Sequence, residues 1–340
     1  MDTTLQILYL NQKDIYALRG DDMALAVKDM ERVFELFEAG DVLVPDKVSM
    51  NFGKTIAEEK TKGRINAMPG YLGGEYNMAG MKWVGSNPGN LQRGLPRASA
   101  ITILNDPVTK FPVCIMDGSL VSAMRTGAVG GVAAKYLAKE NSKSLLLIGA
   151  GFQSRTQLEA ILVGQPNLEN IFISDLNLEL AEQYTSEMSE KLGRTIQVVK
   201  NPKECAQLCD IVVTVTGAAS PVLDADWLSS GSLYINVGGF ECTYATVEKA
   251  DRRFVDNWVA VKHRNTSAIA KMVNEGLLND QDIDANIGEV INKTKDGRRS
   301  NEEIIYFNCV GMGIEDVAIA TRLYKEALAE NIGQSLSYWD

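Results

Sequence analysis

The sequence contains few of the residues that metal centres and disulfide-bonded folds use. Its 340 residues include five cysteines and one histidine. Because the cysteines are odd in number and scattered, we expect no disulfide framework. Cys205 and Cys209 lie four positions apart, but no second pair of ligands follows them, so we expect no metal site. The histidine, His263, stands between two basic residues, and we interpret it as a solvated loop residue.

The sequence also lacks a surplus of basic residues and any long apolar segment. Its net charge is −10, which argues against nucleic acid or an anionic membrane surface as a partner. No apolar run approaches the roughly 20 residues of a membrane-spanning helix. The first residues lack the basic start and the cleavage site of a signal peptide, so we expect a cytoplasmic protein. Catalysis in such a chain must rely mainly on Lys, Arg, Asp, Glu, backbone groups or a cofactor.

From residue 144 onward, short apolar segments alternate with segments of helical spacing. This alternation predicts an α/β fold with a Rossmann-type, doubly wound parallel sheet covered by helices on both faces. The expected strands are 144–149, 170–175, 195–199, 211–216, 232–237 and 253–257, and the expected helices are 153–164 and 177–192.

The first 115 residues have a different pattern, with many glycines and strand-like segments joined by short turns. We expect strands at 64–68, 79–85, 98–106 and 111–117, and helices at 22–38 and 118–139. This predicts a mainly antiparallel, β-rich domain. A last helix at 313–330 returns to it, so both chain ends build this domain. The expected domains are 1–125 with 318–340, and 126–317.

A glycine-rich turn follows the first strand of the second domain. It reads Gly149-Ala150-Gly151-Phe152-Gln153 and opens a helix, so that unpaired N–H groups could bind a pyrophosphate. Asp175 ends the next strand, where its carboxylate could bind the adenosine ribose and repel a 2′-phosphate. We therefore predict NAD as the cofactor, and the alternative is a purely structural turn.

Two cations lie in apolar surroundings. Arg125, on a helix of small residues, would bind a substrate carboxylate bidentately, or it could form a structural salt bridge. Lys82, on an expected strand, could be partly buried with a lowered pKa and transfer protons, or it could be a surface lysine.

Further residues at expected strand ends are candidates for the site. Thr214, Thr216, Val237 and Gly238 end strands at the edge where a cofactor binds, and Glu241 follows as a possible acid or base. Met312 lies in a glycine-flanked turn and is expected to contact the cofactor. The acidic pair 315–316 falls in the first turn of the last helix, where we favour a helix-dipole role over catalysis.

The segments "MKWVGS", "AMRTGAV", "IGAGFQSRTQ", "INVGG" and "VGMGIEDVA", in this order, resemble the ornithine cyclodeaminase/mu-crystallin family. The resemblance covers about residues 5–335. It implies that 126–317 is an NAD(P)-binding Rossmann domain and that 1–125 with 318–340 is a substrate-binding and dimerisation domain. It also implies a homodimer formed through the β-rich part, and chemistry at the α C–N bond of amino acids. Lys82 matches the family's catalytic lysine and Arg125 its carboxylate-binding arginine. Glu241 stands where cyclodeaminases carry an essential aspartate.

Three features depart from the cyclodeaminase pattern, and the first is Glu241 in place of that aspartate, which alters the reach of the carboxylate. Asn66 replaces the glutamate that precedes the Met-Pro pair, and Arg97 brings a cation where cyclodeaminases have none. With Arg64 and Arg125, Arg97 would suit a substrate with three carboxylates. The sequence looks most like the branch that splits N-(2-amino-2-carboxyethyl)-L-glutamate into 2-oxoglutarate and L-2,3-diaminopropionate, a precursor of siderophores and peptide antibiotics. A cyclodeaminase acting on ornithine or lysine is the first alternative, and a non-enzymatic NAD(P)-binding protein like mu-crystallin is the second.

Overall fold

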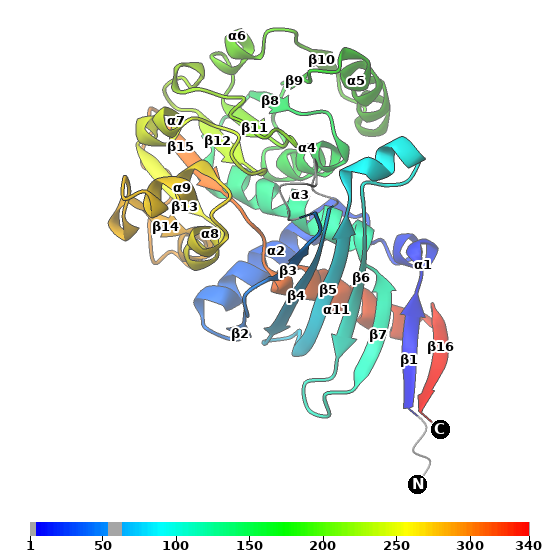
Figure 1. Ribbon diagram of the computed structural model, residues 1–340. Helices are drawn as coiled ribbons and strands as arrows, with labels where there is room; N and C mark the ends of the chain where they lie inside the picture. Colours follow the sequence, from blue (N-terminus) through cyan, green and yellow to red (C-terminus); the bar gives the residue numbers. More distant parts are fainter. Residues whose placement is uncertain (1–4, 54–62, 340) are drawn as a thin grey trace. The chain divides into compact units, whose positions relative to one another are not determined.

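The computed structural model describes residues 5–53 and 63–339 and divides the chain into two compact units (Figure 1). The first unit comprises Met1–Arg125 and Met312–Asp340, and the second comprises Thr126–Gly311. The second boundary lies a few residues before the expected one at 317. The reason is that helix α11 (Gly313–Glu330) packs along its length on strands β4 and β5 of the first unit.

The first unit is built on a mixed sheet with strand order β16-β1-β7-β6-β5-β4-β2, in which β3 also pairs with β4. Its strands are β1 (Leu5–Leu10), β2 (Val42–Leu43), β3 (Val48–Asn51), β4 (Arg64–Leu72), β5 (Met78–Ser86), β6 (Ala98–Asn105), β7 (Pro112–Asp117) and β16 (Gln334–Trp339). The expectation of a mainly antiparallel unit is confirmed, since β1 runs parallel to β7 and the other pairs are antiparallel. Its helices are α1 (Gln12–Ala17), α2 (Met23–Glu38), η1 (Pro88–Arg93), α11 and the first part of α3 (Gly118–Leu137).

Two glycines let α11 lie close to this sheet. A Cβ at Gly70 would come 2.8 Å from Ile314, and a Cβ at Gly80 would come 3.1 Å from Val317. Side chains alternate between the two faces of a sheet along each strand. Residues an even number of positions from Gly70 on β4, or from Gly80 on β5, therefore face α11, and the residues between them face the other way. Lys82 is therefore on the face that α11 covers.

The strands at the edge of the sheet were not predicted from the sequence. β1 pairs with β16, so the two ends of the chain run side by side there (Figure 1). Each segment is short, and nothing local distinguishes it from a terminal extension. Pairing between residues at opposite ends of the chain is what makes them strands.

The second unit contains a parallel sheet with strand order β10-β9-β8-β11-β12-β15-β13-β14. Its strands are β8 (Ser144–Ile148), β9 (Asn170–Ser174), β10 (Ile196–Val198), β11 (Ile211–Thr214), β12 (Leu233–Asn236), β13 (Arg252–Val255), β14 (Ala285–Asn286) and β15 (Ile305–Asn308). The strand order reverses direction between β8 and β11, as in a doubly wound fold, so the predicted fold class is confirmed. β14 and β15 were not predicted.

Helices connect these strands. They are α4 (Phe152–Gly164), α5 (Leu178–Leu192), α6 (Pro202–Ala206), η2 (Ala225–Trp227), α7 (Tyr244–Lys249), α8 (Trp258–Arg264), α9 (Ala268–Asn274), η3 (Asp280–Asp282) and α10 (Ile287–Ile291). His263 is exposed as expected, but it lies in the last turn of α8 and not in a loop. Among the described residues, no helix is long and apolar enough to cross a membrane.

Candidate active site

Lys82 is a buried lysine at the centre of the sheet in the first unit. It lies on β5 opposite Met68 of β4 and Thr102 of β6, and its side chain is only 2% exposed. Its Nζ is 3.0 Å from the hydroxyl of Ser122 on α3 and 2.9 Å from Oδ2 of Asp316 on α11. This burial rules out the alternative of a surface lysine and brings three distant segments together at one ammonium group.

The acidic pair at the start of α11 holds both cations of the site. Glu315 accepts a hydrogen bond from Met312 N through Oε1, which closes a capping box, and one from Arg125 Nη1 at 2.9 Å through Oε2. Oδ1 of Asp316 is 3.6 Å from Arg125 Nε. Both carboxylates lie in the first turn of α11, where they complement the helix dipole, and each also forms a buried ion pair that the sequence did not reveal.

The resulting cluster contains two cations and two carboxylates, all largely withdrawn from water. Burial and the nearby Arg125 charge lower the pKa of Lys82 to about 8, although Asp316 and Glu315 act in the opposite direction. A lysine with this pKa exists in both protonation states near neutral pH, so it can donate or accept a proton. Neither Glu315 nor Asp316 was proposed as a site residue from the sequence. The signal that could have revealed them was an acidic pair placed between the apolar residues Ile314 and Val317.

The other predicted substrate-binding residues lie on strands near Lys82, but not all on one face. Arg64 and Asn66 alternate with Met68 on β4 and therefore share the face of Lys82. Asn66 is buried, and its Oδ1 has no hydrogen-bond partner among the described residues. Arg64 is exposed, and no ion pair joins it to another described residue.

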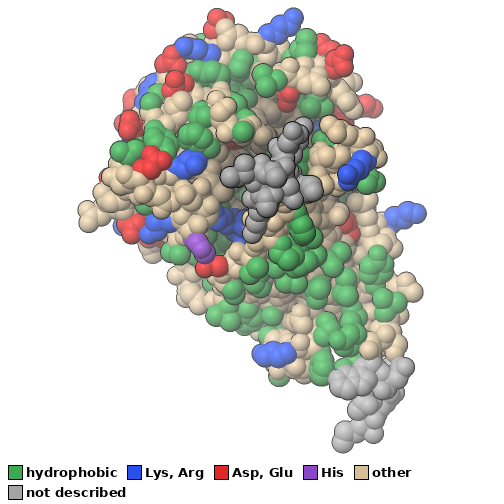
Figure 2. Space-filling model, viewed as in Figure 1, with side chains coloured by type: hydrophobic (Ala, Val, Ile, Leu, Met, Phe, Trp, Pro, Cys, Tyr) green, Lys and Arg blue, Asp and Glu red, His purple; other side chains and the backbone are tan. Residues whose placement is uncertain are grey.

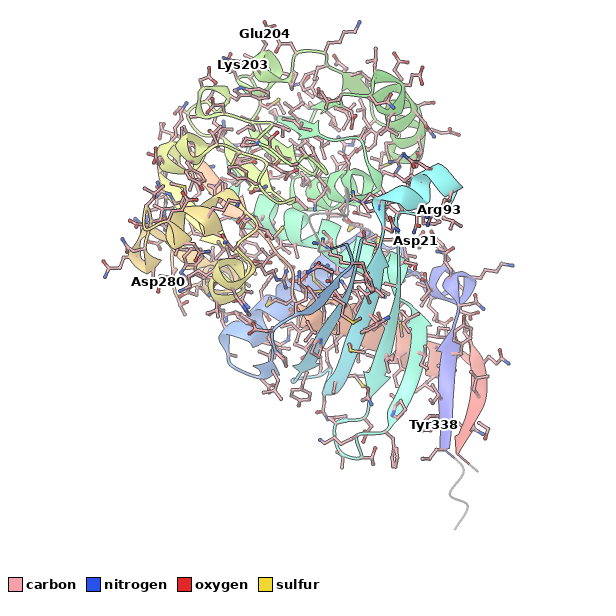
Figure 3. All side chains as sticks on the ribbon, in the orientation of Figure 1. Asp21, Arg93, Lys203, Glu204, Asp280 and Tyr338 are labelled. Atoms are coloured by element: carbon pink, nitrogen blue, oxygen red, sulfur yellow. The ribbon has the colours of Figure 1, made fainter. Side chains whose placement is uncertain are left out.

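Arg97 belongs to the opposite face of the same sheet. Its carbonyl accepts a hydrogen bond from Asn87 N, which extends the β5–β6 ladder by one rung beyond Ala98. Strand alternation then directs its side chain away from the face that carries Arg64 and Lys82. Arg97 is exposed, as is Arg93 of η1 (Figure 3). The role of Arg97 in binding substrate stays a prediction.

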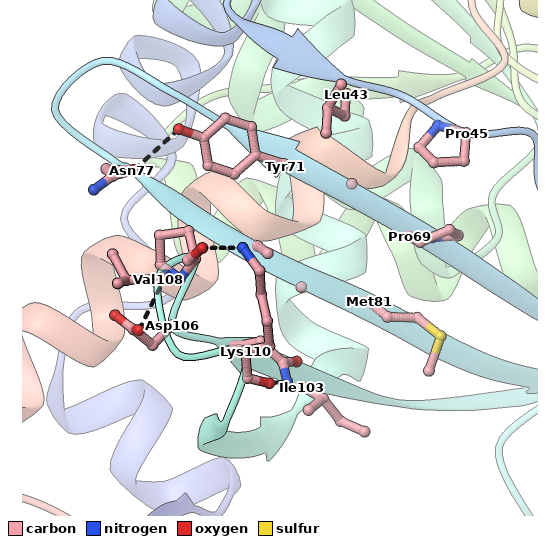
Figure 4. A pocket seen from close by; sticks show the side chains of 15 residues that line it. Leu43, Pro45, Pro69, Tyr71, Asn77, Met81, Ile103, Asp106, Val108 and Lys110 are labelled. Carbon is pink, nitrogen blue, oxygen red and sulfur yellow. Dashed lines mark hydrogen bonds between the residues drawn. The ribbon is translucent and has the colours of Figure 1, made fainter.

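Apolar side chains of β5 and β6 lie on that opposite face. Trp83 and Ile101 stand opposite each other on β5 and β6, and both are exposed. Figure 2 shows hydrophobic side chains gathered over the strands of this unit. An open pocket on the same face is lined by Pro69, Tyr71, Met81 and Ile103, and by the turn that links β6 to β7 (Figure 4). With no Lys82 or Arg125 in its lining, this pocket lacks the groups that the predicted chemistry needs.

The glycine-rich turn of the second unit has the local geometry that a dinucleotide needs. Gly149, directly after β8, has a φ of +106°, and a Cβ there would lie 2.8 Å from the carbonyl of Val215. Gly151 is the N-cap of α4 and provides no side-chain cap, while the space beside it is open, with no atom within 4 Å of an added Cβ. A helix N-terminus that is open on the side of Gly151 suits a pyrophosphate.

Asp175, at the end of β9, lies beside this turn. Its two carboxylate oxygens accept hydrogen bonds from Ala150 N and Asn177 N, each at 2.8 Å. These bonds fix the carboxylate where a ribose would bind and leave each oxygen able to accept a second hydrogen bond. The residues of the second unit therefore fit a nicotinamide dinucleotide, and Asp175 fits one without a 2′-phosphate.

Arg155 is a residue of this site that sequence reasoning missed. Its Nη1 donates to the carbonyls of Ala150 and Gly151, while its Nε and Nη2 bind Glu187 on α5. The guanidinium also lies over the Tyr184 ring. Arg155 thus fixes the glycine-rich turn from within its own helix. Its position four residues after Gly151 was the signal available in the sequence.

Glu241 is completely buried and surrounded by hydrogen-bond donors. Oε1 accepts from the N–H and the hydroxyl of Thr216, and Oε2 accepts from Thr214 Oγ1, Asn236 Nδ2 and Gly238 N. These five bonds tie together the ends of β11 and β12. The Glu241 carboxylate therefore supports the ends of these strands. Thr214 and Thr216 supply three of its five hydrogen bonds. A role of Glu241 in proton transfer stays a prediction, as do the cofactor contacts of both threonines.

The remaining predicted cofactor residues are spread over both units. Phe152 is 69% exposed, whereas Gln153 is half-buried and donates to Thr156. Val237 and Gly238 are half-buried beyond β12. Met312 is buried and belongs to the first unit, where it caps α11. Their contacts with a cofactor stay predictions.

The described residues contain no cluster of three or more His, Cys, Asp or Glu side chains that could hold a metal ion. The Cys205 and Cys209 sulfurs are 3.8 Å apart, but no further ligand joins them among those residues.

Comparison with known proteins agrees with this arrangement. The model of the ornithine cyclodeaminase/mu-crystallin family matches residues 12–331. The chain is 36% identical to an alanine dehydrogenase from Archaeoglobus fulgidus, with 98% of this chain and 99% of the relative covered. It is 32% identical to the N-((2S)-2-amino-2-carboxyethyl)-L-glutamate dehydrogenase of Staphylococcus aureus, over 98% of this chain and 99% of the relative.

Among solved structures, an archaeal alanine dehydrogenase dimer with bound NAD superposes with a TM-score of 0.88 at 35% identity, covering 98% of this chain and 100% of that one. The protein belongs to the ornithine cyclodeaminase/mu-crystallin family.

Proposed function

We propose that this protein is an NAD-dependent dehydrogenase that oxidises the α C–N bond of N-(2-amino-2-carboxyethyl)-L-glutamate. Water then releases 2-oxoglutarate and L-2,3-diaminopropionate, and NAD⁺ becomes NADH with loss of one proton. The observation that carries the proposal is the buried cluster in which Lys82 and Arg125 meet the carboxylates of α11. A protein that only binds a nucleotide has no need for such a cluster, because burying four charges is costly.

NAD is the cofactor of this enzyme. The first turn of α4 after Gly151 would bind its pyrophosphate, and Asp175 would bind its ribose. NAD⁺ supplies the acceptor for the hydride that leaves the α-carbon. Arg155 keeps the carbonyls of the glycine-rich turn in place while the cofactor binds.

Arg125 is the group proposed to bind the α-carboxylate of the amino acid. Its guanidinium presents five N–H donors in a planar fork, which matches a carboxylate bidentately. Glu315 fixes one edge of this fork through Nη1. A fixed fork loses less conformational entropy when it binds the substrate.

Lys82 is the group proposed to exchange the proton of the substrate nitrogen. Hydride can leave the α-carbon only when the nitrogen has a lone pair to form the C=N bond, so the protonated secondary amine must first lose a proton. Neutral Lys82 takes this proton. The ammonium that results later returns it to the amine that leaves when water has attacked the imine carbon.

The choice of substrate rests on cations beyond Lys82 and Arg125. The proposed substrate has three carboxylates, and Arg64 extends the positive charge along the same face of β4. Asn66, next to it on that face, has an Oδ1 without a hydrogen-bond partner among the described residues, and this oxygen could accept an N–H of the substrate. The 32% identity to a dehydrogenase of this substrate supports the same choice. A place in siderophore or antibiotic synthesis stays a prediction.

Alanine dehydrogenase activity is the second candidate. Arg97, the cation that distinguishes the sequence from cyclodeaminases, lies on the sheet face opposite Lys82. A site without Arg97 has fewer groups for additional carboxylates, and the 36% identity to an alanine dehydrogenase supports this reading.

A homodimer is proposed through the apolar face of the first unit. Trp83 and Ile101 are exposed there beside the pocket of Figure 4, and contiguous apolar surface of this kind marks interaction sites. The related archaeal structure is a dimer. Sedimentation of the wild-type protein and of a Trp83→Glu variant tests this, because a charge in the interface should shift a dimer towards monomer.

The substrate is tested by supplying NAD⁺ with each candidate in turn and following NADH and the keto acid. With N-(2-amino-2-carboxyethyl)-L-glutamate we expect equal amounts of NADH and 2-oxoglutarate. NADH and pyruvate formed from alanine alone would favour the second candidate. Ammonia released from ornithine without net NADH would instead identify a cyclodeaminase.

A further inference from the structure

The two carboxylates of the Lys82 cluster are bound in different ways. Both oxygens of Glu315 accept hydrogen bonds, one from the N-cap of α11 and one from Arg125. Asp316 is fully buried, yet it accepts no backbone hydrogen bond from the described residues. Its compensation there comes from two side-chain cations, Lys82 at 2.9 Å and Arg125 at 3.6 Å.

This difference indicates different tasks. Glu315 caps α11 and holds Arg125, so the helix itself needs it. Asp316 caps nothing, and a buried carboxylate costs several kcal/mol unless a cation accompanies it. The ion pair with Lys82 is the contact that explains its presence.

We propose that Asp316 is a positioning residue of the reaction, which holds the Lys82 ammonium and sets the pH range in which Lys82 accepts the proton of the substrate nitrogen. The proposal rests on the function proposed above, in which Lys82 exchanges that proton. Under this proposal, Asp316 on α11 controls the position and the protonation of Lys82 on β5.

The groups around Lys82 oppose one another, and Asp316 is the one that favours the ammonium most. From α3, Arg125 disfavours a second positive charge, and Ser122 contributes a neutral hydroxyl. From α11, Asp316 and, more weakly, Glu315 favour it. On the sheet itself, the neighbours opposite Lys82 are the uncharged Met68 and Thr102. Removal of the Asp316 charge therefore lowers the pKa of Lys82.

The proton step balances within this cluster. The N–H bond of the protonated substrate amine breaks, a new N–H bond forms on Lys82 Nζ, and the nitrogen keeps the electron pair. The positive charge thus moves from the substrate to Lys82, where Asp316 stabilises it. No other reactant takes part in this step.

The test compares Asp316→Asn with a matched control, Glu315→Gln, which removes the same charge one residue away. We expect the rising limb of kcat/KM against pH to move to lower pH by about one unit in Asp316→Asn. The variant removes the negative charge that favours the Lys82 ammonium, so the pKa of Lys82 falls. The plateau should fall at least about tenfold, because Nζ is no longer held in place. In Glu315→Gln the main effect should be a higher KM, with a clearly smaller movement of the limb.

A second variant covers the case in which Asp316→Asn does not fold. Asp316→Glu keeps the charge but displaces Lys82, so the limb should stay near its wild-type position while kcat falls at least about tenfold. A limb that stays in place in folded Asp316→Asn, or a wild-type kcat in Asp316→Glu, would overturn the proposal.

The measurement uses whichever amino acid the wild-type enzyme oxidises, so an error in the proposed substrate does not affect it. Calorimetric titration of that amino acid into the protein without NAD, in buffers of different ionisation enthalpy, gives a readout independent of turnover. The titration gives the number of protons taken up or released per amino acid bound. The midpoint of its change with pH should lie at lower pH in Asp316→Asn than in the wild type. An unchanged midpoint in that variant would contradict the proposed role even if kcat had fallen.

Discussion

The Lys82 ammonium lies 2.9 Å from the carboxylate of Asp316, and both side chains are buried in the first unit. One residue is on a central strand and the other is in the first turn of the last helix. Burial and Arg125 lower the pKa of this lysine to about 8, while Asp316 acts against that shift. Several of the expected properties of the enzyme depend on it.

The first prediction concerns pH. Neutral Lys82 is the base, so kcat/KM should rise about tenfold per pH unit at low pH. Because the pKa of Lys82 is lowered to about 8, the rise should level off near that pH and not near the ordinary pKa of 10.5. A rate that stays flat from about pH 6 to about pH 9 would show that another group accepts the proton. Lys82→Met should lose about 10²–10⁴-fold in turnover while NADH fluorescence still reports binding.

The second prediction concerns Glu241. In Glu241→Gln the amide NH₂ must face either Thr216 or the donors on the other oxygen, so at least one buried N–H loses its acceptor. We expect the free energy of unfolding to fall by about 1–3 kcal/mol, with the pH profile of kcat/KM unchanged. A variant of wild-type stability in urea with a changed pH profile would instead indicate that Glu241 transfers protons.

The third prediction concerns the glycine-rich turn. Gly151→Val should fold normally, since an added Cβ meets no atom within 4 Å, but its side chain would occupy the space of a pyrophosphate. NADH binding, measured by fluorescence, should be lost. Gly149→Ala is the contrasting variant, because its φ of +106° and the nearby Val215 carbonyl should destabilise the protein itself. Normal NADH binding by Gly151→Val would mean that the turn is only structural.

The fourth prediction concerns the choice between NAD and NADP. Asp175→Ala removes an acceptor for the ribose hydroxyls and the charge that repels a 2′-phosphate. Affinity for NADH should fall, and the preference for NADH over NADPH should narrow. The variant also loses the hydrogen bonds to Ala150 N and Asn177 N, so its melting temperature serves as a control for a loosened turn. Equal affinities of variant and wild type for both cofactors would place the ribose elsewhere.

The fifth prediction uses Arg97 to distinguish the candidate substrates. If Arg97 binds a carboxylate of the tricarboxylate, Arg97→Ala should weaken that substrate by about 1.5–3 kcal/mol in kcat/KM. Oxidation of alanine should not change, because alanine has no additional carboxylate. Arg93→Ala, which removes another exposed cation nearby, is the control for general charge effects. Unimpaired use of the tricarboxylate by Arg97→Ala would show that Arg97, on its opposite sheet face, takes no part.

The sequence by itself determined the features that depend on neighbouring residues. The apolar segments before Gly149 and Asp175 have the length and composition of buried strands. The turn that follows the first of them requires glycine at position 149, because φ is positive there. The doubly wound sheet, the helices that follow its first strands and the NAD-binding turn could therefore be predicted. The β-rich unit was predictable for the same reason, because its alternating strands and turns are local patterns.

Only the tertiary structure decided which charges meet. Lys82, Arg125 and Asp316 are far apart in the chain, and nothing local to any of them specifies the other two. The same is true of Glu241, which turns towards Thr216 and Gly238, and of β1, which becomes an inner strand by pairing with β16 and β7. Arg97 and Arg64 look alike in the sequence, but strand alternation places them on opposite faces. Pairing energies of buried charges and register in a sheet are set by the whole fold, since both depend on residues brought close only when the chain is folded.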